Sequence, residues 1–120
     1  ASVALIGGCG ASPHRDVVSR AAVSFVTDIE HHDDSGACRL LTDTARTSAS
    51  GATNLSCDRA LAFVHESGSR ISGLQVWGDT AQVHVGSDVL FLRRFPDAWL
   101  VSAAGCRPQQ DGPYDCLVGG

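Results

Sequence analysis

The apolar positions near the start of the chain recur at the spacing of one helix face. Pro13 suits the first turn of a helix, and Ser12 before it is a favourable N-cap residue. The pattern predicts a helix over residues 13–31, and the polar run HHDDSG at residues 31–36 is predicted to end it. The side chains expected on its buried face are Val18, Ala22, Phe25, Val26 and Ile29.

Two shorter helices are predicted after this break. The first covers residues 37–45. The second begins at a capping residue, Asn54 or Ser56, and runs to about Glu66. Thr, Ser, Ala and Gly dominate residues 46–54, so the stretch between these helices is predicted to be a loop.

The second half of the chain changes to the period of two that is typical of strands. Ala81, Val83 and Val85 alternate with polar neighbours, as in a half-buried strand. Short turns separate the runs, which favours an antiparallel meander. We therefore predict an α+β fold, with the helices packed on one face of a curved four-stranded sheet. The four runs cover residues 71–77, 80–85, 89–95 and 99–104.

Composition and charge exclude several classes of protein. A chain of 120 residues is one domain, large enough to own a core. With 43% apolar and 18% charged residues, it is neither a disordered acidic tail nor a coiled coil. The net charge is −4, and Arg93-Arg94 is the only pair of adjacent basic residues. A nucleic-acid partner is therefore not expected.

The N-terminus indicates an extracytoplasmic location. The apolar run over residues 1–8 ends in small residues and predicts the tail of a signal peptide. The sequence IGGC at residues 6–9 resembles the bacterial lipobox, which implies a lipoprotein whose Cys9 carries diacylglycerol. Residues 9–15 would tether the domain, residues 16–120, to the outer face of the cell membrane. The alternative is a plain apolar start with an ordinary buried cysteine.

The other four cysteines form an even set. Four cysteines allow three pairings. Cys106 and Cys116 flank a loop rich in Pro, Gly and Gln, so a bridge between them is easy to close, which leaves Cys38 with Cys57. Two disulfides agree with an extracytoplasmic location. Zinc is the alternative, but neither C-x-x-C nor H-x-x-x-H spacing occurs.

Two segments of the predicted sheet resemble a known superfamily. Residues 77–83, WGDTAQV, and residues 91–101, FLRRFPDAWLV, are similar to the strand pair of the nuclear transport factor two-like (cystatin-like) proteins. The endings AGC at residues 104–106 and PYDC at residues 113–116 resemble small secreted actinobacterial proteins of this type. The resemblance implies a cone of helices and curved meander over about residues 16–118, with a pocket at its open end.

Enzymes on such a cone use a carboxylate or histidine in the pocket, with a tyrosine or second acid beside it. The single tyrosine, Tyr114, falls in the loop between the last two cysteines rather than in a strand. Asp28 is the better candidate for a pocket acid, although a solvated helix face is the simpler interpretation. Asp79 and Asp88 are predicted to be solvated turn residues.

Two tryptophans and one arginine complete the candidates for a pocket. Trp77 and Trp99 are predicted to pack between sheet and helices, and lining a cleft is the alternative. Arg93 and Arg94 place one guanidinium on each strand face, so one is solvated and the other could pair with a helix carboxylate or address an anionic group. Arg93 is the candidate for the pocket.

The densest set of ligand-type side chains is HHDD at residues 31–34. Adjacent residues on an irregular loop rarely converge on one metal, so we interpret this run as polar helix termination. His84 alternates with apolar neighbours and is predicted to point outward. We expect no metal and no cofactor.

The first hypothesis is a non-catalytic binding or interaction domain, anchored to the membrane by lipid. Its partner would be a small molecule or an envelope protein, and a homodimer through the sheet face is a further possibility. The second hypothesis is an enzyme like ketosteroid isomerase, with Asp28 as base. A buried ionisable group beside a second polar group at the open end would favour the enzyme.

Overall fold

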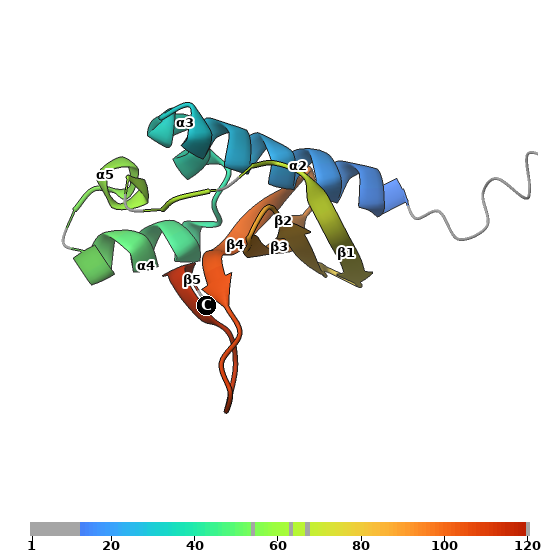
Figure 1. The fold of residues 1–120 in the computed structure, drawn as a ribbon. Coiled ribbons are helices and arrows are strands. Elements are labelled where there is room, and N and C mark those ends of the chain that lie inside the picture. The colour runs from blue at the N-terminus through green and yellow to red at the C-terminus, as the bar shows by residue number, and fades with distance from the viewer. Residues whose placement is uncertain (1–12, 54, 63, 67, 120) are drawn as a thin grey trace, which may run out of the picture.

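The computed structural model describes residues 13–53, 55–62, 64–66 and 68–119, so Ser12 and Cys9 lie outside the described residues. Within these ranges helices come first and one antiparallel sheet follows, with strands in sequence order (Figure 1). The α+β class is confirmed, but the sheet has five strands rather than four. The elements are α2 (Pro13–Glu30), α3 (Asp34–Arg39), α4 (Asp43–Thr53), α5 (Cys57–Leu61), β1 (Ile71–Trp77), β2 (Thr80–Val85), β3 (Asp88–Phe95), β4 (Ala98–Arg107) and β5 (Asp115–Gly119).

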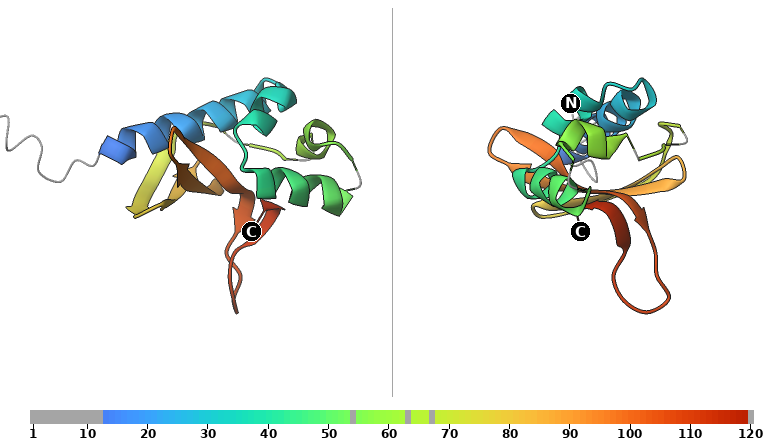
Figure 2. Two further views of the ribbon diagram at one scale, coloured as in Figure 1. Left: turned by 180° about the vertical axis from the view of Figure 1, so that it is seen from behind. Right: turned by 90° about the vertical axis from the view of Figure 1, so that its left-hand side faces the viewer.

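Helix α2 is the long helix that the apolar spacing predicts, and it lies across the sheet (Figures 1 and 2). All five predicted inward residues are at most 5% exposed. His32 adopts a left-handed backbone, φ 60°, just after the helix ends. Asp33 then caps α3 by accepting a hydrogen bond from the Gly36 amide at 3.1 Å. The polar run therefore ends one helix and begins the next. No described helix is long and apolar enough to cross a membrane.

The predicted helix over 37–45 is wrong, and so is the predicted loop over 46–54 as far as residue 53, the last described residue of that stretch. The chain leaves the helical path at Leu40, because it pairs there with the edge of β4. The Val101 amide donates to the Leu40 carbonyl at 2.7 Å, and the Thr42 amide donates to the Val101 carbonyl at 2.9 Å. The Thr42 hydroxyl then caps α4, accepting a hydrogen bond from the Ala45 amide at 3.0 Å.

Helix α4 occupies most of the stretch that its Ser, Thr and Gly content marks as a loop. Ala45 and Ala49 lie one turn apart and are almost fully buried. Burial of this small-residue face supplies what helix propensity lacks, because packing of one face dominates the stability of most helices in proteins.

The third predicted helix is also shorter than expected. Of its two predicted caps, Asn54 lies outside the described residues, and Ser56 occupies the N-cap position but its hydroxyl donates to Asp58 instead of capping the helix. Helix α5 ends at Leu61 instead of Glu66. Ala60 and Leu61 are buried, and Cys57 is bonded to Cys38 of α3. So short a helix depends on these tertiary constraints, and the described residues between it and β1, 62, 64–66 and 68–70, form no further regular helix.

Tight two-residue turns join the first four strands, as the short predicted turns require. Gly78 and Gly86 open the first two turns with φ 57°, a value that glycine adopts without steric cost. The third turn, Pro96-Asp97, needs no positive φ among its residues. These turns set the registers, in which Val83 pairs with Leu74 on one side and with Leu90 on the other.

The C-terminal segment is a fifth strand, where the predicted sheet ended with its fourth run at residue 104. Strand β5 pairs with β4, and Cys106 lies directly opposite Cys116, to which it is bonded. Val118 of β5 is 3% exposed and belongs to the main core. The β4–β5 hairpin extends away from α2, beyond the rest of the sheet (Figures 1 and 2).

The two faces of the sheet differ in what covers them. Leu90 and Leu92 of β3 belong to the main core, which the sheet shares with the helices. Phe91, between them, points to the opposite face and joins a smaller cluster there. That cluster contains Val89, Ala103 and Cys106, with Phe91, Tyr114 and Cys116 packed against it.

Candidate functional site

A pocket in the described structure lies on the sheet face opposite the main core. It is an open groove of about 840 Å³. Phe91 and Ala103 line it from the sheet, Tyr114 lines it from the hairpin, and Thr44 and Ser48 line it from α4. The rings of Phe91 and Tyr114 meet edge to face, with centroids 5.3 Å apart. An apolar sheet surface thus meets hydroxyl groups at one side.

Arg93 also lines the groove and gives the groove a positive charge. Arg93 and Arg94 occupy opposite strand faces, as predicted, and both are exposed. Arg94 is paired with Asp79 at 2.8 Å. In the described part of the chain, no carboxylate lies within ion-pair distance of Arg93. The groove therefore presents an unpaired guanidinium two residues along β3 from Phe91.

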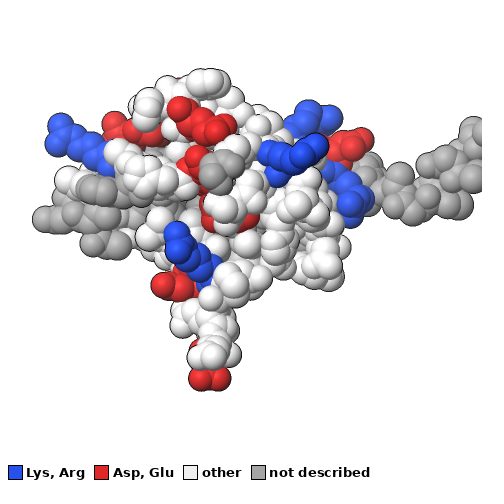
Figure 3. All heavy atoms as spheres, viewed as in Figure 1, with Lys and Arg blue, Asp and Glu red and all other residues white. Residues whose placement is uncertain are grey.

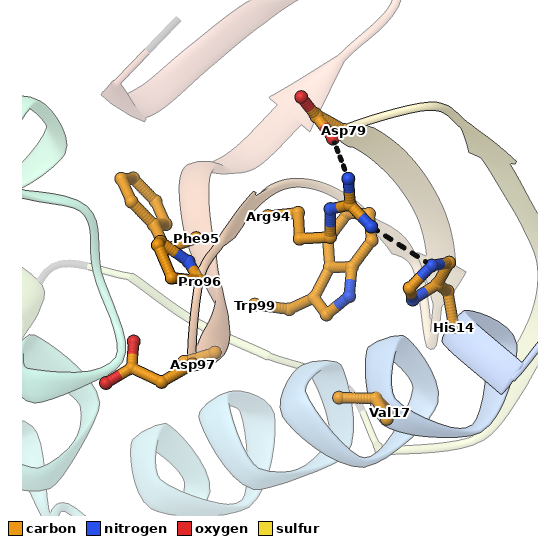
Figure 4. Close-up of a pocket in the computed structure, with 9 residues that line it drawn as sticks. His14, Val17, Asp79, Arg94, Phe95, Pro96, Asp97 and Trp99 are labelled. Carbon is orange, nitrogen blue, oxygen red and sulfur yellow. Dashed lines mark hydrogen bonds and ion pairs between the residues drawn. The ribbon is translucent and has the colours of Figure 1, made fainter.

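A smaller pocket of about 450 Å³ lies on the other side, where α2 begins (Figure 4). Arg94 reaches between Asp79 and His14 there and donates to His14 Nε2 at 3.2 Å. The His14 ring packs against Trp99 with centroids 5.8 Å apart. The Arg94 guanidinium is bound by a carboxylate and an imidazole of the chain itself, so its charge is already paired within this pocket. It holds the start of α2 against the sheet.

Asp88 is buried, which contradicts its prediction as a solvated turn residue. Its side chain is 8% exposed and accepts hydrogen bonds from three backbone amides: Val89 at 2.7 Å, Gly105 at 3.1 Å and Cys106 at 2.9 Å. The register between β3 and β4 shifts beside these residues, and Gly105 has φ 64°. A bulge removes amides from the ladder. The carboxylate satisfies two of them, which explains its burial.

Glu66 approaches this carboxylate from the segment between α5 and β1. Both of its carboxyl oxygens are buried, and no donor in the described structure reaches them. Burial, the neighbouring Asp88 carboxyl and the charge of Glu30 raise the pKa of Glu66 to about 9. Two carboxylates offer each other no donor, so their contact becomes a hydrogen bond only when one is protonated. At neutral pH Glu66 is therefore the protonated partner.

The four residues predicted for a pocket are not brought together. Trp99 lines the smaller pocket and Arg93 the groove, whereas Asp28 and Trp77 line neither. Trp77 is 54% exposed, so its prediction as a packed residue is wrong, while Trp99, at 5%, is buried as predicted. Asp28 lies beside Asp33, and burial together with that carboxylate raises its pKa.

His84 lies on the exposed side of β2. His84 is exposed, which confirms that it points outward. Its ring nitrogen Nε2 lies 3.4 Å from the Gln82 amide, and that amide also donates to the Tyr114 hydroxyl at 3.3 Å. Among the described residues, no group of three or more His, Cys, Asp or Glu side chains is arranged to hold a metal ion.

Acidic and basic side chains alternate over the face shown in Figure 3, and the visible surface of the projecting hairpin is mostly uncharged. This surface gives no sign of the continuous basic stripe that binding of a nucleic-acid backbone requires.

Sequence reasoning missed Phe91, Tyr114 and Glu66 as site residues. Phe91 could have been found, because it alternates with Leu90 and Leu92, two apolar residues that must face the other side. Glu66 had no local signal, since its environment comes from α2 and β3, which are distant in the sequence.

No family model, curated protein or solved structure matches the chain. The resemblance to the nuclear transport factor two-like superfamily therefore stays a prediction.

Proposed function

We propose that this chain is a non-catalytic, extracytoplasmic binding domain, anchored to the outer face of the cell membrane by lipid on Cys9. The observation that carries the binding function is the groove beside Phe91 and Tyr114, because a concave, largely apolar site with a few polar groups is the usual form of a ligand pocket. The disulfides Cys38–Cys57 and Cys106–Cys116 support an oxidising compartment.

The binding function is tested with two aromatic probes of the same shape, 2-naphthamide and naphthalene-2-carboxylate. We expect at least one to bind saturably and to shift the backbone amide resonances of Phe91, Ser102 and Tyr114 in NMR spectra of the full chain. The amide of Val17, in the smaller pocket, serves as the internal reference. If neither probe shifts the groove resonances, the groove is not a binding site and the proposed function is wrong.

The anchor is tested separately in cells. Cys9→Ser removes the thiol that would carry the lipid, so we expect the variant to move from the membrane fraction into the medium. The control is a strain in which other lipoproteins are processed normally. Retention of the variant in the membrane fraction would contradict the anchor and leave the binding function standing.

A homodimer through the sheet face competes for the same surface. If two copies met there, they would cover Phe91 and exclude the probes. Sedimentation velocity over a hundredfold range of concentration distinguishes the two, because only a dimer changes its sedimentation coefficient with dilution.

A second candidate function is acid–base catalysis, with the paired carboxyls of Glu66 and Asp88 as candidates in place of Asp28. Both are buried and line neither the groove nor the smaller pocket. A protonated carboxyl held beside a carboxylate can stabilise a developing oxyanion by hydrogen bonding. The test is conversion of a β,γ-unsaturated cyclic ketone to its conjugated isomer, followed by ultraviolet absorbance. Turnover that Glu66→Gln abolishes would support the enzyme, and absence of turnover above buffer would favour the binding domain.

A further inference from the structure

The apolar, charged and polar side chains that line the groove identify a class of ligand. This inference rests on the proposed binding function. Its apolar part is the edge-to-face pair of Phe91 and Tyr114, with Ala103 beside them. Aromatic rings of this kind bind flat apolar bodies through their faces and edges. A ring system of the ligand would therefore lie over Phe91.

The charged part of the groove is Arg93, two residues further along the same strand. Because residues i and i+2 of a strand share a face and are separated by about 7 Å, the guanidinium and the Phe91 ring address opposite ends of one small molecule. Since Arg93 has no carboxylate partner among the described residues, its charge is available to a ligand. Arginine binds carboxylates through two parallel hydrogen bonds, which fixes orientation as well as charge.

The neutral polar groups of the groove add donors rather than charge. The Tyr114 oxygen accepts from the Gln82 side-chain amide at 3.3 Å, so its own hydroxyl proton points elsewhere and can be donated. Thr44 and Ser48 contribute hydroxyl groups from α4. None of the described residues that line the groove is acidic. Its electrostatics therefore favour an anion over a cation.

From these contacts we infer that the groove binds a small monocarboxylate with an aromatic or alicyclic body. The carboxylate lies against Arg93, and the ring body packs on Phe91 and Tyr114. The volume of about 840 Å³ is within the usual range for a small-molecule site.

The same two naphthalene probes test this inference, because they share a ring body and differ only in charge. We expect naphthalene-2-carboxylate to bind the full chain about tenfold more tightly than 2-naphthamide in isothermal titration, as an added charged hydrogen bond implies. Arg93→Gln should bring the affinity for the carboxylate down to that for the amide and leave the amide unchanged. Arg94→Gln, on the opposite face, is the matched control and should leave the tenfold preference intact.

The other possible results of these titrations contradict either the carboxylate assignment or the binding function. Equal affinity for both probes in the native chain, or a preference that survives Arg93→Gln, overturns the carboxylate assignment while the groove remains a binding site. A preference lost equally in Arg94→Gln shows that long-range charge, and not the groove geometry, selects the anion, which also overturns it. Failure of both probes to bind contradicts the proposed binding function itself.

Discussion

The two disulfides close regions that are built in different ways. In the helical cap, which we define as α3 and α5, Cys38–Cys57 joins helices of six and five residues that have no strand ladder to hold them. In the β4–β5 hairpin, Cys106–Cys116 joins two residues that already face each other in a hydrogen-bonded ladder. In the cap, the disulfide therefore takes the place of hydrogen bonds between the two helices. In the hairpin, it reinforces a ladder that already exists.

The contact between Glu66 and Asp88 connects these two regions. Glu66 follows the cap in the chain, and Asp88 binds the amides of Gly105 and Cys106 where the hairpin begins. The Gly68 amide, next to this contact, donates to Glu30 of α2 at 3.1 Å. One protonated carboxyl thus lies where helices, sheet and hairpin meet. Four sets of variants test this difference between the cap and the hairpin. They start with the loss of a disulfide and end with the smallest expected change.

Removing the cap disulfide should cost more stability than removing the hairpin disulfide. Chain entropy contributes about 3 kcal/mol for either loop. Only the cap should also lose packing, because its buried Ala37 and Leu61 depend on the bridge for their position. We expect the Cys38→Ala/Cys57→Ala variant to melt at a lower temperature than the Cys106→Ala/Cys116→Ala variant at equal pH and concentration. Equal melting temperatures would show that the hairpin contributes as much to the core as the cap.

Asp88→Asn should destabilise the protein by about 2 kcal/mol, because hydrogen bonds to a charged acceptor are stronger than those to a neutral amide. The control is Asp79→Asn, in a solvated turn whose ion pair with Arg94 is exposed, where we expect less than about 1 kcal/mol. Urea unfolding measures both changes. A similar cost for the two variants would contradict the role of Asp88 in the bulge.

Glu66→Gln should stabilise the protein at pH 8 and leave it nearly unchanged at pH 5. With a folded pKa of about 9 and an unfolded value near 4.5, native Glu66 keeps a proton that the unfolded chain releases. Its contribution is therefore complete at low pH and declines as pH rises, by at most about 1.4 kcal/mol per pH unit. Glutamine donates to Asp88 without titrating.

The measurement is the difference in free energy of unfolding between the native chain and this variant, taken at several pH values from 5 to 8. Taking the difference cancels groups that titrate in both proteins. A difference that does not change with pH would show that Glu66 is ionised in the native state.

Gly51→Ala should give the smallest change, a gain of about 0.5–1 kcal/mol, because alanine favours helix over glycine. An added Cβ meets no atom within 4 Å at this position of α4. Gly112→Ala, where φ is 117°, is the control and should destabilise the hairpin. Thermal unfolding reports both, and a loss of stability in Gly51→Ala would mean that residues 46–53 are not helical.

Regular patterns along the chain determined the elements that depend on local spacing. The buried face of α2, the first four strands and their turns all follow from periods of 3.6 or 2 and from well-placed Gly and Pro residues. The Cys106–Cys116 pairing also followed from a short loop that closes easily, and Cys38–Cys57 was the pairing that remained.

Only the tertiary structure decided the elements whose stability comes from distant partners. Val101 of β4 interrupts the helix predicted over 37–45, and burial of Ala45 and Ala49 turns a loop-like sequence into α4. Asp88 is buried because a bulge in β4 presents amides to it. Glu66 holds a proton because burial, and after it the Asp88 and Glu30 carboxyls, raise its pKa. Hydrogen-bond partners and local polarity of this kind arise from long-range contacts, so no window of neighbouring residues contains the information that determines them.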